Sequence, residues 1–259
     1  MSFPHVHIRG YFDFLCPWCY IGKIRLEKAI RLARVKAEVE WIPFELYAHQ
    51  EGHRIHREHI AGNEHLDKIY QQLSLMAAEE HIVIRQHPYE KSSRRALTGI
   101  LFARTHGKMD EYMRDVYAEV FEYGNDVSSL MVLGRIALKL GWNVEEFLRF
   151  IDEKKNHDQM VHESETAKQA GVHGVPTYII NGYTLAGTIP VRELSALLRE
   201  HARATPTHHS TTHLSKKKKK TAARARKNTK QGSKKTLPRG KPISTPKRRA
   251  APLKTPKKR

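Results

Sequence analysis

Short runs of apolar residues, several of them alternating with polar positions, mark the chain near its beginning and again much later. The runs over 6–13 and 36–42 are rich in β-branched and aromatic residues, and each predicts a β-strand. A third run over 177–180 leads into Asn181-Gly182. That pair is typical of a two-residue hairpin turn, so a fourth strand is expected over 183–186.

Elsewhere apolar residues recur at helical spacing. The pattern over 20–35 predicts an amphipathic helix directly after the first strand, and a last helix is expected from Pro190 to about residue 203. The whole region 57–168 is predicted to be helical. Within it, helices are predicted over 65–81, 92–106, 110–121, 129–140, 144–152 and 159–170.

The predicted elements follow the order strand–helix–strand, a block of helices, and then strand–strand–helix. This order predicts an α/β protein with a thioredoxin fold and a large all-helical insertion. We expect residues 1–57 to form the first part of the fold, 58–168 the insertion and 169–203 the second part. Residues 204–259 are expected to be a disordered tail rich in Lys and Arg.

The positive charge of the chain is concentrated in this tail. The formal net charge is +19, yet residues 201–259 hold 21 Lys and Arg and no Asp or Glu, so residues 1–200 carry a charge of −2. The tail has six prolines and no aromatic residue, too little apolar surface to order itself. Such a chain binds phosphate backbones without sequence specificity, so nucleic acid is an expected partner of 216–259. A tail that only solvates the protein is the alternative.

The chain contains only two cysteines, Cys16 and Cys19, which excludes a secreted scaffold held by several disulfides. The N-terminus lacks a basic stretch followed by an apolar run, and no apolar stretch reaches the length of a membrane span. We therefore expect no membrane association and a cytoplasmic location, near the nucleoid if the tail binds DNA. In that reducing compartment a Cys-x-x-Cys pair is typically catalytic or metal-binding.

The two cysteines lie where the first strand meets the first helix, in Cys16-Pro17-Trp18-Cys19. Pro17 suits the first helical position, and a helix N-terminus favours the thiolate that attacks disulfides. Cys19, one turn later, is placed to attack a mixed disulfide formed on Cys16. Trp18 is expected to shield the sulfur and to form part of the substrate surface. Because Trp18 carries no positive charge, we expect a less oxidising pair than a Cys-Pro-His-Cys centre.

Two other interpretations of the cysteine pair stay open at this point. In one, the pair is chemically idle. In the other, histidines that follow the second strand complete a Cys₂His₂ zinc site; the candidates are His49, His53, His56 and His59. We expect redox chemistry, with neither a metal nor a cofactor.

A second motif, Gly174-Val175-Pro176-Thr177, leads into the third predicted strand. Proline cannot donate a hydrogen bond to a neighbouring strand, so Pro176 marks an edge or a bend. A cis bond before Pro176 would bring the Val175 backbone beside the Cys16 sulfur, with its polar groups open to a substrate peptide. A trans bond would make this an ordinary loop end.

Three separated motifs carry a family resemblance. They are Asp13-Phe14-Leu15-Cys16-Pro17-Trp18-Cys19-Tyr20-Ile21-Gly22-Lys23, Pro43-Phe44-Glu45-Leu46, and Ala170-Gly171-Val172-His173-Gly174-Val175-Pro176-Thr177-Tyr178. Together they resemble the DsbA family of thiol–disulfide oxidoreductases, and within it the cytoplasmic FrnE-like branch, over residues 5 to 203. The resemblance implies that Cys16 is the nucleophile, Cys19 the resolving cysteine and Pro176 a cis proline. It also implies protein or low-molecular-weight thiols and disulfides as substrates.

Two relatives of this family have other activities: kappa-class glutathione transferases and 2-hydroxychromene-2-carboxylate isomerases. They resemble the chain over the same span, use glutathione, and typically have a serine where Cys16 stands. The presence of both cysteines favours dithiol chemistry, and a glutathione-dependent enzyme is the alternative. A nucleic-acid-associated protein, whose fold serves for docking or redox sensing, is a further hypothesis.

Asp13, three residues before Cys16, has two possible roles. It relays protons for Cys19, or it caps the following helix through backbone N–H groups, which its position favours. Arg94-Arg95 and Lys154-Lys155 are predicted to lie on solvated helix faces.

Overall fold

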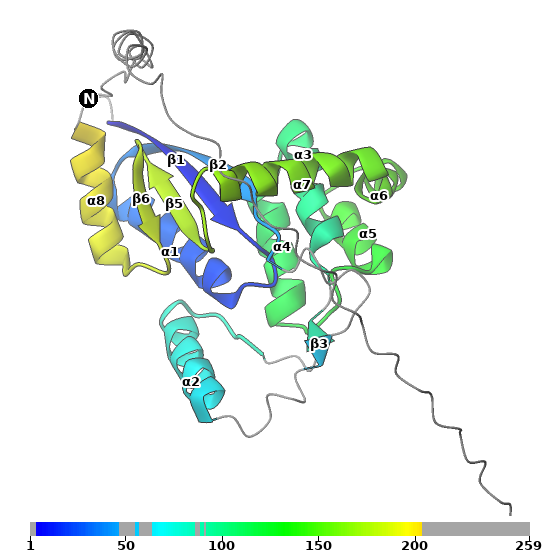
Figure 1. Ribbon diagram of the computed structural model, residues 1–259, viewed down its shortest axis with the longest axis horizontal. Helices are drawn as coiled ribbons and strands as arrows, with labels where there is room; N and C mark the ends of the chain where they lie inside the picture. Colours follow the sequence, from blue (N-terminus) through cyan, green and yellow to red (C-terminus); the bar gives the residue numbers. More distant parts are fainter. Residues whose placement is uncertain (1–3, 47–54, 57–63, 86–88, 91, 204–259) are drawn as a thin grey trace, which may run out of the picture. The chain divides into compact units, whose positions relative to one another are not determined.

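The computed structural model describes residues 4–46, 55–56, 64–85, 89–90 and 92–203. It confirms the predicted fold class: a thioredoxin-like α/β fold with a mixed sheet and a helical insertion (Figure 1). The predicted basic tail, 204–259, lies outside the described residues.

The sheet has four strands in the order β2-β1-β5-β6. β1 (His5–Phe12) runs parallel to β2 (Lys36–Pro43) and antiparallel to β5 (Thr177–Ile180). β6 (Tyr183–Ala186) returns antiparallel to β5 through the predicted turn, whose two residues, Asn181-Gly182, both have positive φ. β1 therefore joins the beginning of the chain to a strand that follows the insertion.

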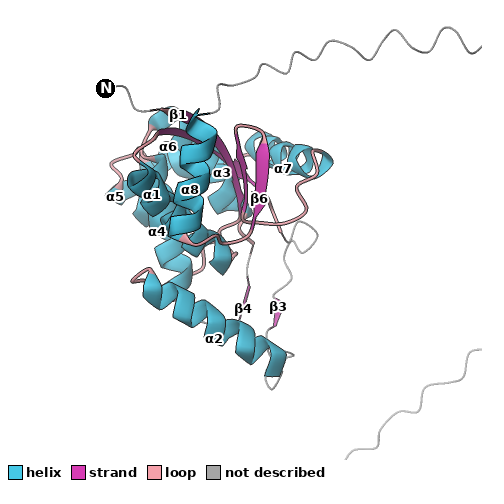
Figure 2. Cartoon of the chain, turned by 90° about the vertical axis from the view of Figure 1, so that its left-hand side faces the viewer, coloured by secondary structure: helices cyan, strands magenta, loops and turns pink. Residues whose placement is uncertain are grey.

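Helices cover both faces of the sheet. α1 (Pro17–Ala33) packs against α8 (Val191–Arg203) over one face, and α7 (Lys154–Gln169) lies on the other (Figure 2). β1 contributes side chains to the packing on both faces of the sheet, because successive side chains of a strand point to opposite faces. Ile8 belongs to the larger core with α1 and α8, whereas Tyr11 packs with residues of the α7 side.

The insertion consists mainly of helices, and their predicted positions agree with the structure to within a few residues, except that α7 begins earlier. Before α7 the helices are α2 (Glu64–Glu79), α3 (Arg94–His106), α4 (Met109–Phe121), α5 (Leu130–Lys139) and α6 (Val144–Asp152). The Asn143 side chain accepts a hydrogen bond from the Glu146 N–H, which caps α6.

One part of this region is not helical. β3 (Ile55–His56) and β4 (Tyr89–Glu90) pair antiparallel as a separate two-stranded sheet. The prediction that 57–168 is helical throughout is therefore wrong at β4. Two residues per strand make an alternation too short to be recognised in a sequence.

Ion pairs join α2, drawn in cyan in Figure 1, to α1. Arg25 on α1 binds Glu79 at the end of α2 with an N–O distance of 2.8 Å, and the next residue, Glu80, at 2.7 Å. Lys28 binds Glu80 at 2.7 Å. Arg25 and Glu80 are both buried, so each neutralises a charge that would be costly alone.

Aromatic side chains connect the sheet to the insertion behind the turn between β1 and α1. The buried ring of Phe14 lies 5.0 Å from the ring of Tyr117 and 6.0 Å from that of Tyr112, both on α4. Tyr20 on α1 stacks on Tyr117 with 5.0 Å between ring centroids. Each such pair contributes about 0.5–1.5 kcal/mol beyond the burial of its area, so this turn is firmly held.

Arg94 does not lie on a solvated helix face, in contrast to the prediction from the sequence. Its guanidinium donates two hydrogen bonds, of 3.0 and 2.9 Å, to the carboxylate of Glu45, which is only 3% exposed. Arg95 is more exposed and pairs with Asp152 at 2.7 Å. The Arg94–Glu45 pair fixes the segment after β2 against the first turn of α3, because an unpaired carboxylate is costly at this depth.

Replacing Arg94 by Met tests this pair. We expect R94M to lower the free energy of unfolding by about 3 kcal/mol, because Glu45 would stay buried without its partner. Urea unfolding at pH 7 measures the loss, and the double variant R94M/E45Q should recover most of it. A loss within about 0.5 kcal/mol for R94M, the range of ordinary surface substitutions, would contradict this account.

Candidate active site

Cys16 lies where β1 ends and α1 begins. Its backbone is extended, with φ −92° and ψ 109°, and it is the N-cap residue of α1, with Pro17 in the first turn. Its sulfur accepts a hydrogen bond from the Cys19 N–H at 3.3 Å. Its own N–H donates to the Asp13 carbonyl at 3.2 Å, which closes the turn. The Cys16 sulfur thus takes the place of an N-cap oxygen, at the positive end of the helix dipole.

Cys19 lies one turn into α1 and is buried, as Cys16 is; both are free thiols. Burial raises the pKa of the Cys19 thiol well above its ordinary value, and the hydrogen bond to Cys16 and the Cys16 charge raise it further. The Asp13 N–H, which donates to the Cys19 sulfur, lowers it. The two sulfurs are therefore in contact but in unlike environments.

The loop before β5 brings a carbonyl to the Cys16 sulfur. The Val175–Pro176 peptide bond is cis, and the Val175 carbonyl accepts a hydrogen bond from the Cys16 thiol at 3.6 Å. The loop is held on both sides: the Thr177 hydroxyl donates to the Gly174 carbonyl at 2.7 Å, and the Gly187 N–H donates to the Pro176 carbonyl at 2.8 Å. The fold thus brings Cys16 and Val175, which are 159 positions apart in the chain, into hydrogen-bond contact.

Trp18 is the exposed member of the Cys-Pro-Trp-Cys motif, with 38% of its surface accessible. Leu46, at the end of the second family motif, is equally exposed, and its N–H donates to the Asp13 carboxylate at 2.8 Å. Trp18 and Leu46 are therefore two apolar side chains that are open to solvent near Asp13 and Cys16 in the chain fold.

Asp13 is fully buried, and its carboxylate joins three segments. One oxygen accepts the Leu15 N–H at 2.9 Å and the other accepts the Leu46 N–H, while the hydroxyl of Ser93 also donates to the group. Burial raises the pKa of Asp13 to about 6, against the opposing effect of these hydrogen bonds.

Of the two roles considered for Asp13, the structure does not bear out the helix cap. Its side chain bonds the N–H of Leu15, which precedes the helix, and the N–H of Leu46, which follows β2. The N-cap of α1 is Cys16 itself. The buried carboxylate therefore ties the turn before α1 to the segment that follows β2. Ser93, at the N-cap of α3, makes no cap bond of its own, and its hydroxyl goes to Asp13.

Two buried tyrosines near the cysteines were not predicted from the sequence. The Tyr117 hydroxyl donates to the Asp13 carbonyl at 3.4 Å. Tyr178 lies two residues after Pro176 on β5, hence on the same side of the strand, and this period of two is the signal that could have found it. Burial raises the pKa of both phenols, and the charges of Cys19 and Cys16 raise it further.

Comparison with known proteins decides the family. The family model described as DSBA-like thioredoxin domain matches residues 7–199. The chain belongs to this family. The match covers both cysteines and Pro176, so this DsbA-like chain has its Cys-Pro-Trp-Cys motif and its cis-proline loop within the family domain.

Two relatives and one solved structure illustrate the range of DsbA-like chains. The uncharacterised protein YwbO of Bacillus subtilis is 27% identical over 190 residues, 70% of this chain and 90% of its own. A 2-hydroxychromene-2-carboxylate isomerase of Pseudomonas sp. is 27% identical over 184 residues, 66% and 79% of the two chains. The crystal structure of a probable DsbA oxidoreductase from Streptomyces coelicolor superposes with a TM-score of 0.70, at 23% identity, over 78% of this chain and 92% of that one.

The zinc interpretation of the DsbA-like chain stays untested, because His49, His53 and His59 lie outside the described residues and the side chain of His56 is not described. Among the residues that the structure does describe, no three or more His, Cys, Asp or Glu side chains gather as metal ligands would. Within the same residues, no helix has the length and apolarity needed to span a membrane.

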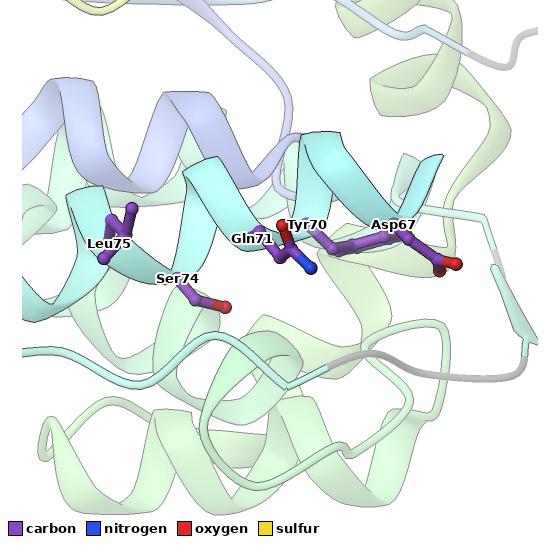
Figure 3. Close-up of a pocket in the computed structure, with 5 residues that line it drawn as sticks. All are labelled: Asp67, Tyr70, Gln71, Ser74 and Leu75. Atoms are coloured by element: carbon purple, nitrogen blue, oxygen red, sulfur yellow. The ribbon is translucent and has the colours of Figure 1, made fainter. Parts of the chain in front are cut away.

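A separate cavity of about 670 Å³ lies along α2 (Figure 3). The described residues that line it all belong to that helix: Asp67, Tyr70, Gln71, Ser74 and Leu75. None of them belongs to the cysteine motif or the cis-proline loop, so this cavity and the dithiol are built by different elements.

The raised pKa of Asp13 makes a testable contribution to stability. The folded pKa of about 6 lies above the ordinary value of 3.8 for an aspartate, so the folded state binds the proton more tightly than the unfolded state. The contribution of Asp13 is therefore most favourable below about pH 4 and is lost as the pH rises through 6, by about 3 kcal/mol in total. The variant D13N should lack this change.

Urea unfolding of both proteins between pH 4 and 7.5 measures the effect. The free energy of unfolding of D13N, minus that of the wild type, should rise across this window, whatever constant offset the lost hydrogen bond adds. Parallel profiles for the two proteins would show that Asp13 keeps its ordinary pKa.

Proposed function

We propose that this chain is a thiol–disulfide oxidoreductase that exchanges the Cys16–Cys19 dithiol and disulfide with protein or low-molecular-weight substrates. The observation that carries the proposal is the geometry of the pair. Two free thiols share one turn at the start of α1, and the outer one faces the carbonyl before a cis proline. Membership of the DsbA-like family supports the same chemistry.

In the first step Cys16, as the thiolate, attacks a substrate disulfide. The bond between Cys16 and one substrate sulfur forms, and the other substrate sulfur leaves as a thiolate. The Cys19 N–H, 3.3 Å from the Cys16 sulfur, supports the negative charge before attack. Trp18 and the Val175 backbone are placed to hold the substrate segment, since one is exposed and the other contacts the attacking sulfur.

In the second step Cys19 attacks Cys16, the intramolecular disulfide forms, and the remaining substrate sulfur leaves. The substrate gains two electrons and the dithiol loses them, and a low-molecular-weight thiol or a protein dithiol then restores it. The reverse sequence oxidises a substrate dithiol. The burial that raises the pKa of Cys19 makes its deprotonation the demanding part of this step.

Asp13 is the group we propose as proton acceptor for Cys19. It is buried with a pKa of about 6, its own N–H donates to the Cys19 sulfur, and its charge raises the Cys19 pKa. A base with this pKa is ionised at neutral pH yet close to the value at which it can be protonated again.

A glutathione-dependent transferase or isomerase is the second candidate. The 27% identity with a 2-hydroxychromene-2-carboxylate isomerase favours it. The two adjacent thiols favour dithiol exchange, because a glutathione-activating site needs only one such group. Dithiol exchange requires both Cys16 and Cys19, whereas a glutathione-dependent enzyme does not require the pair.

Cysteine variants separate the candidates. On mixing with 5,5′-dithiobis(2-nitrobenzoate), the reduced wild type should release two equivalents of thionitrobenzoate per chain, because Cys19 displaces the second from Cys16. The variant C19S should stop after one equivalent, with the mixed disulfide trapped and visible by mass spectrometry. The variant C16S should lose the fast release and all disulfide-reductase turnover.

The outcome that overturns the proposal is equally direct. Turnover that survives in C16S and requires glutathione would assign the chain to the transferase or isomerase class. Loss of turnover in C16S, with its circular dichroism unchanged, separates a chemical role from a folding defect.

For the basic tail we propose binding to nucleic acid by charge. The support is compositional: 21 Lys and Arg, no acidic residue and no aromatic residue follow position 200. We also propose that the enzyme is cytoplasmic and that this tail holds it near the nucleoid.

Truncation tests the tail. The full chain should bind duplex DNA at about 50 mM salt and lose at least tenfold in affinity at about 200 mM, because binding releases condensed counterions. A chain ending at Ala204 should bind weakly at both. Equal binding of the two forms in a filter or gel-shift assay contradicts a DNA-binding tail.

A further inference from the structure

Tyr178 has a buried hydroxyl group with no hydrogen-bond partner among the described residues. A buried, unpartnered hydroxyl is costly, and the groups that persist in native proteins often serve a second state of the molecule. The phenol lies on β5, the strand that begins directly after the cis Pro176.

Gly22 makes room for this hydroxyl. A methyl carbon at Gly22 would lie 2.5 Å from the Tyr178 oxygen and 3.3 Å from the ring of Pro176. Gly22 follows Cys19 by three residues on α1, so the two share one face of the helix. The hydroxyl is therefore held against the face of α1 that carries Cys19.

The same arrangement occurs elsewhere in the fold with a different outcome. A methyl carbon at Gly99 would lie 2.0 Å from the hydroxyl oxygen of Tyr112, also a buried tyrosine. That hydroxyl, however, donates to the Ala96 carbonyl at 2.8 Å. Tyr117, also beside the dithiol, donates to the Asp13 carbonyl. Of Tyr112, Tyr117 and Tyr178, only Tyr178 has a hydroxyl group without a hydrogen-bond partner among the described residues.

Electrostatics point to the dithiol as the partner. Burial raises the pKa of Tyr178, and among charged groups Cys19 contributes most, followed by Cys16. The phenol thus stays protonated and can donate. Each sulfur accepts one backbone N–H, Cys16 from Cys19 and Cys19 from Asp13. Cys19 is the thiol whose burial opposes its charge and the one that shares a helix face with Gly22, so a further donor at this place serves Cys19.

We propose that the Tyr178 hydroxyl is a positioning residue that donates a hydrogen bond to the Cys19 thiolate when Cys19 attacks the mixed disulfide. This inference rests on the proposed dithiol function and deepens it. The Cys19 proton goes to a base, Cys19 forms its bond to the Cys16 sulfur, and the substrate thiolate leaves. Tyr178 transfers no proton and stabilises only the charge that exists before attack.

Stopped-flow release of thionitrobenzoate separates the two steps, since the first equivalent reports Cys16 and the second reports Cys19. In Y178F we expect the first phase to be unchanged and the second to be about tenfold slower, the effect of one lost hydrogen bond to a charged group. The pH midpoint of the second phase should move up by about one unit.

Y112F is the matched control, because it removes the hydroxyl from the other glycine-accommodated tyrosine. It should unfold at lower urea concentration, since it loses a made hydrogen bond, but keep both phases. Y178F should unfold at the same or higher urea concentration. A second phase in Y178F with the wild-type rate and pH midpoint overturns the inference, as does a slower first phase, which would place the donor at Cys16.

These outcomes are distinct from a failure of the proposed function. If the wild type itself releases only one equivalent, dithiol exchange is refuted and the role of Tyr178 with it. If the wild type releases two and Y178F matches it in both phases, only the role of Tyr178 is refuted.

Discussion

The carboxylate of Asp13 is the point at which the segments behind the dithiol meet. It joins the turn before α1, the segment after β2 and the start of α3 through three hydrogen bonds, in a place that water does not reach. The main chain of the same residue bonds Cys16 through its carbonyl and Cys19 through its N–H. Because these contacts share one residue, the sulfurs cannot shift without disturbing the junction of sheet and insertion.

The two cysteines differ because the fold gives them different neighbours. Cys16 sits at a helix entry, between an N–H group and the carbonyl of the cis-proline loop. Cys19 sits in the core, where burial opposes its charge. This difference arises because a two-residue spacer puts one cysteine at the helix N-terminus and the other one turn inside the helix. The aromatic rings of Phe14, Tyr20 and Tyr117 pack behind the turn and contribute to the burial of Cys19.

Much of this arrangement is local and could be read from the sequence. The Cys-Pro-Trp-Cys motif, the Asn181-Gly182 turn and the alternation of the strands each need only neighbouring residues, so they predicted the fold and the position of the two cysteines at a helix N-terminus. The pairing of Arg94 with Glu45 could not be predicted in this way, because the sequence around each residue gives no sign of a partner 49 positions away. The free hydroxyl of Tyr178 was equally out of reach, because it depends on a side chain that Gly22 does not have.

Cys16 is almost fully buried, and this burial restricts which molecules its sulfur can contact. With 4% of the Cys16 surface accessible, its sulfur cannot contact a bond that lies inside a rigid body. Under the proposed dithiol exchange, a partner would have to present its disulfide on a thin, flexible segment that can lie against Trp18 and the Val175 carbonyl. For the proposed exchange, small molecules and unfolded or loosely held chains are therefore the expected substrates, and well-folded proteins with internal disulfides are not.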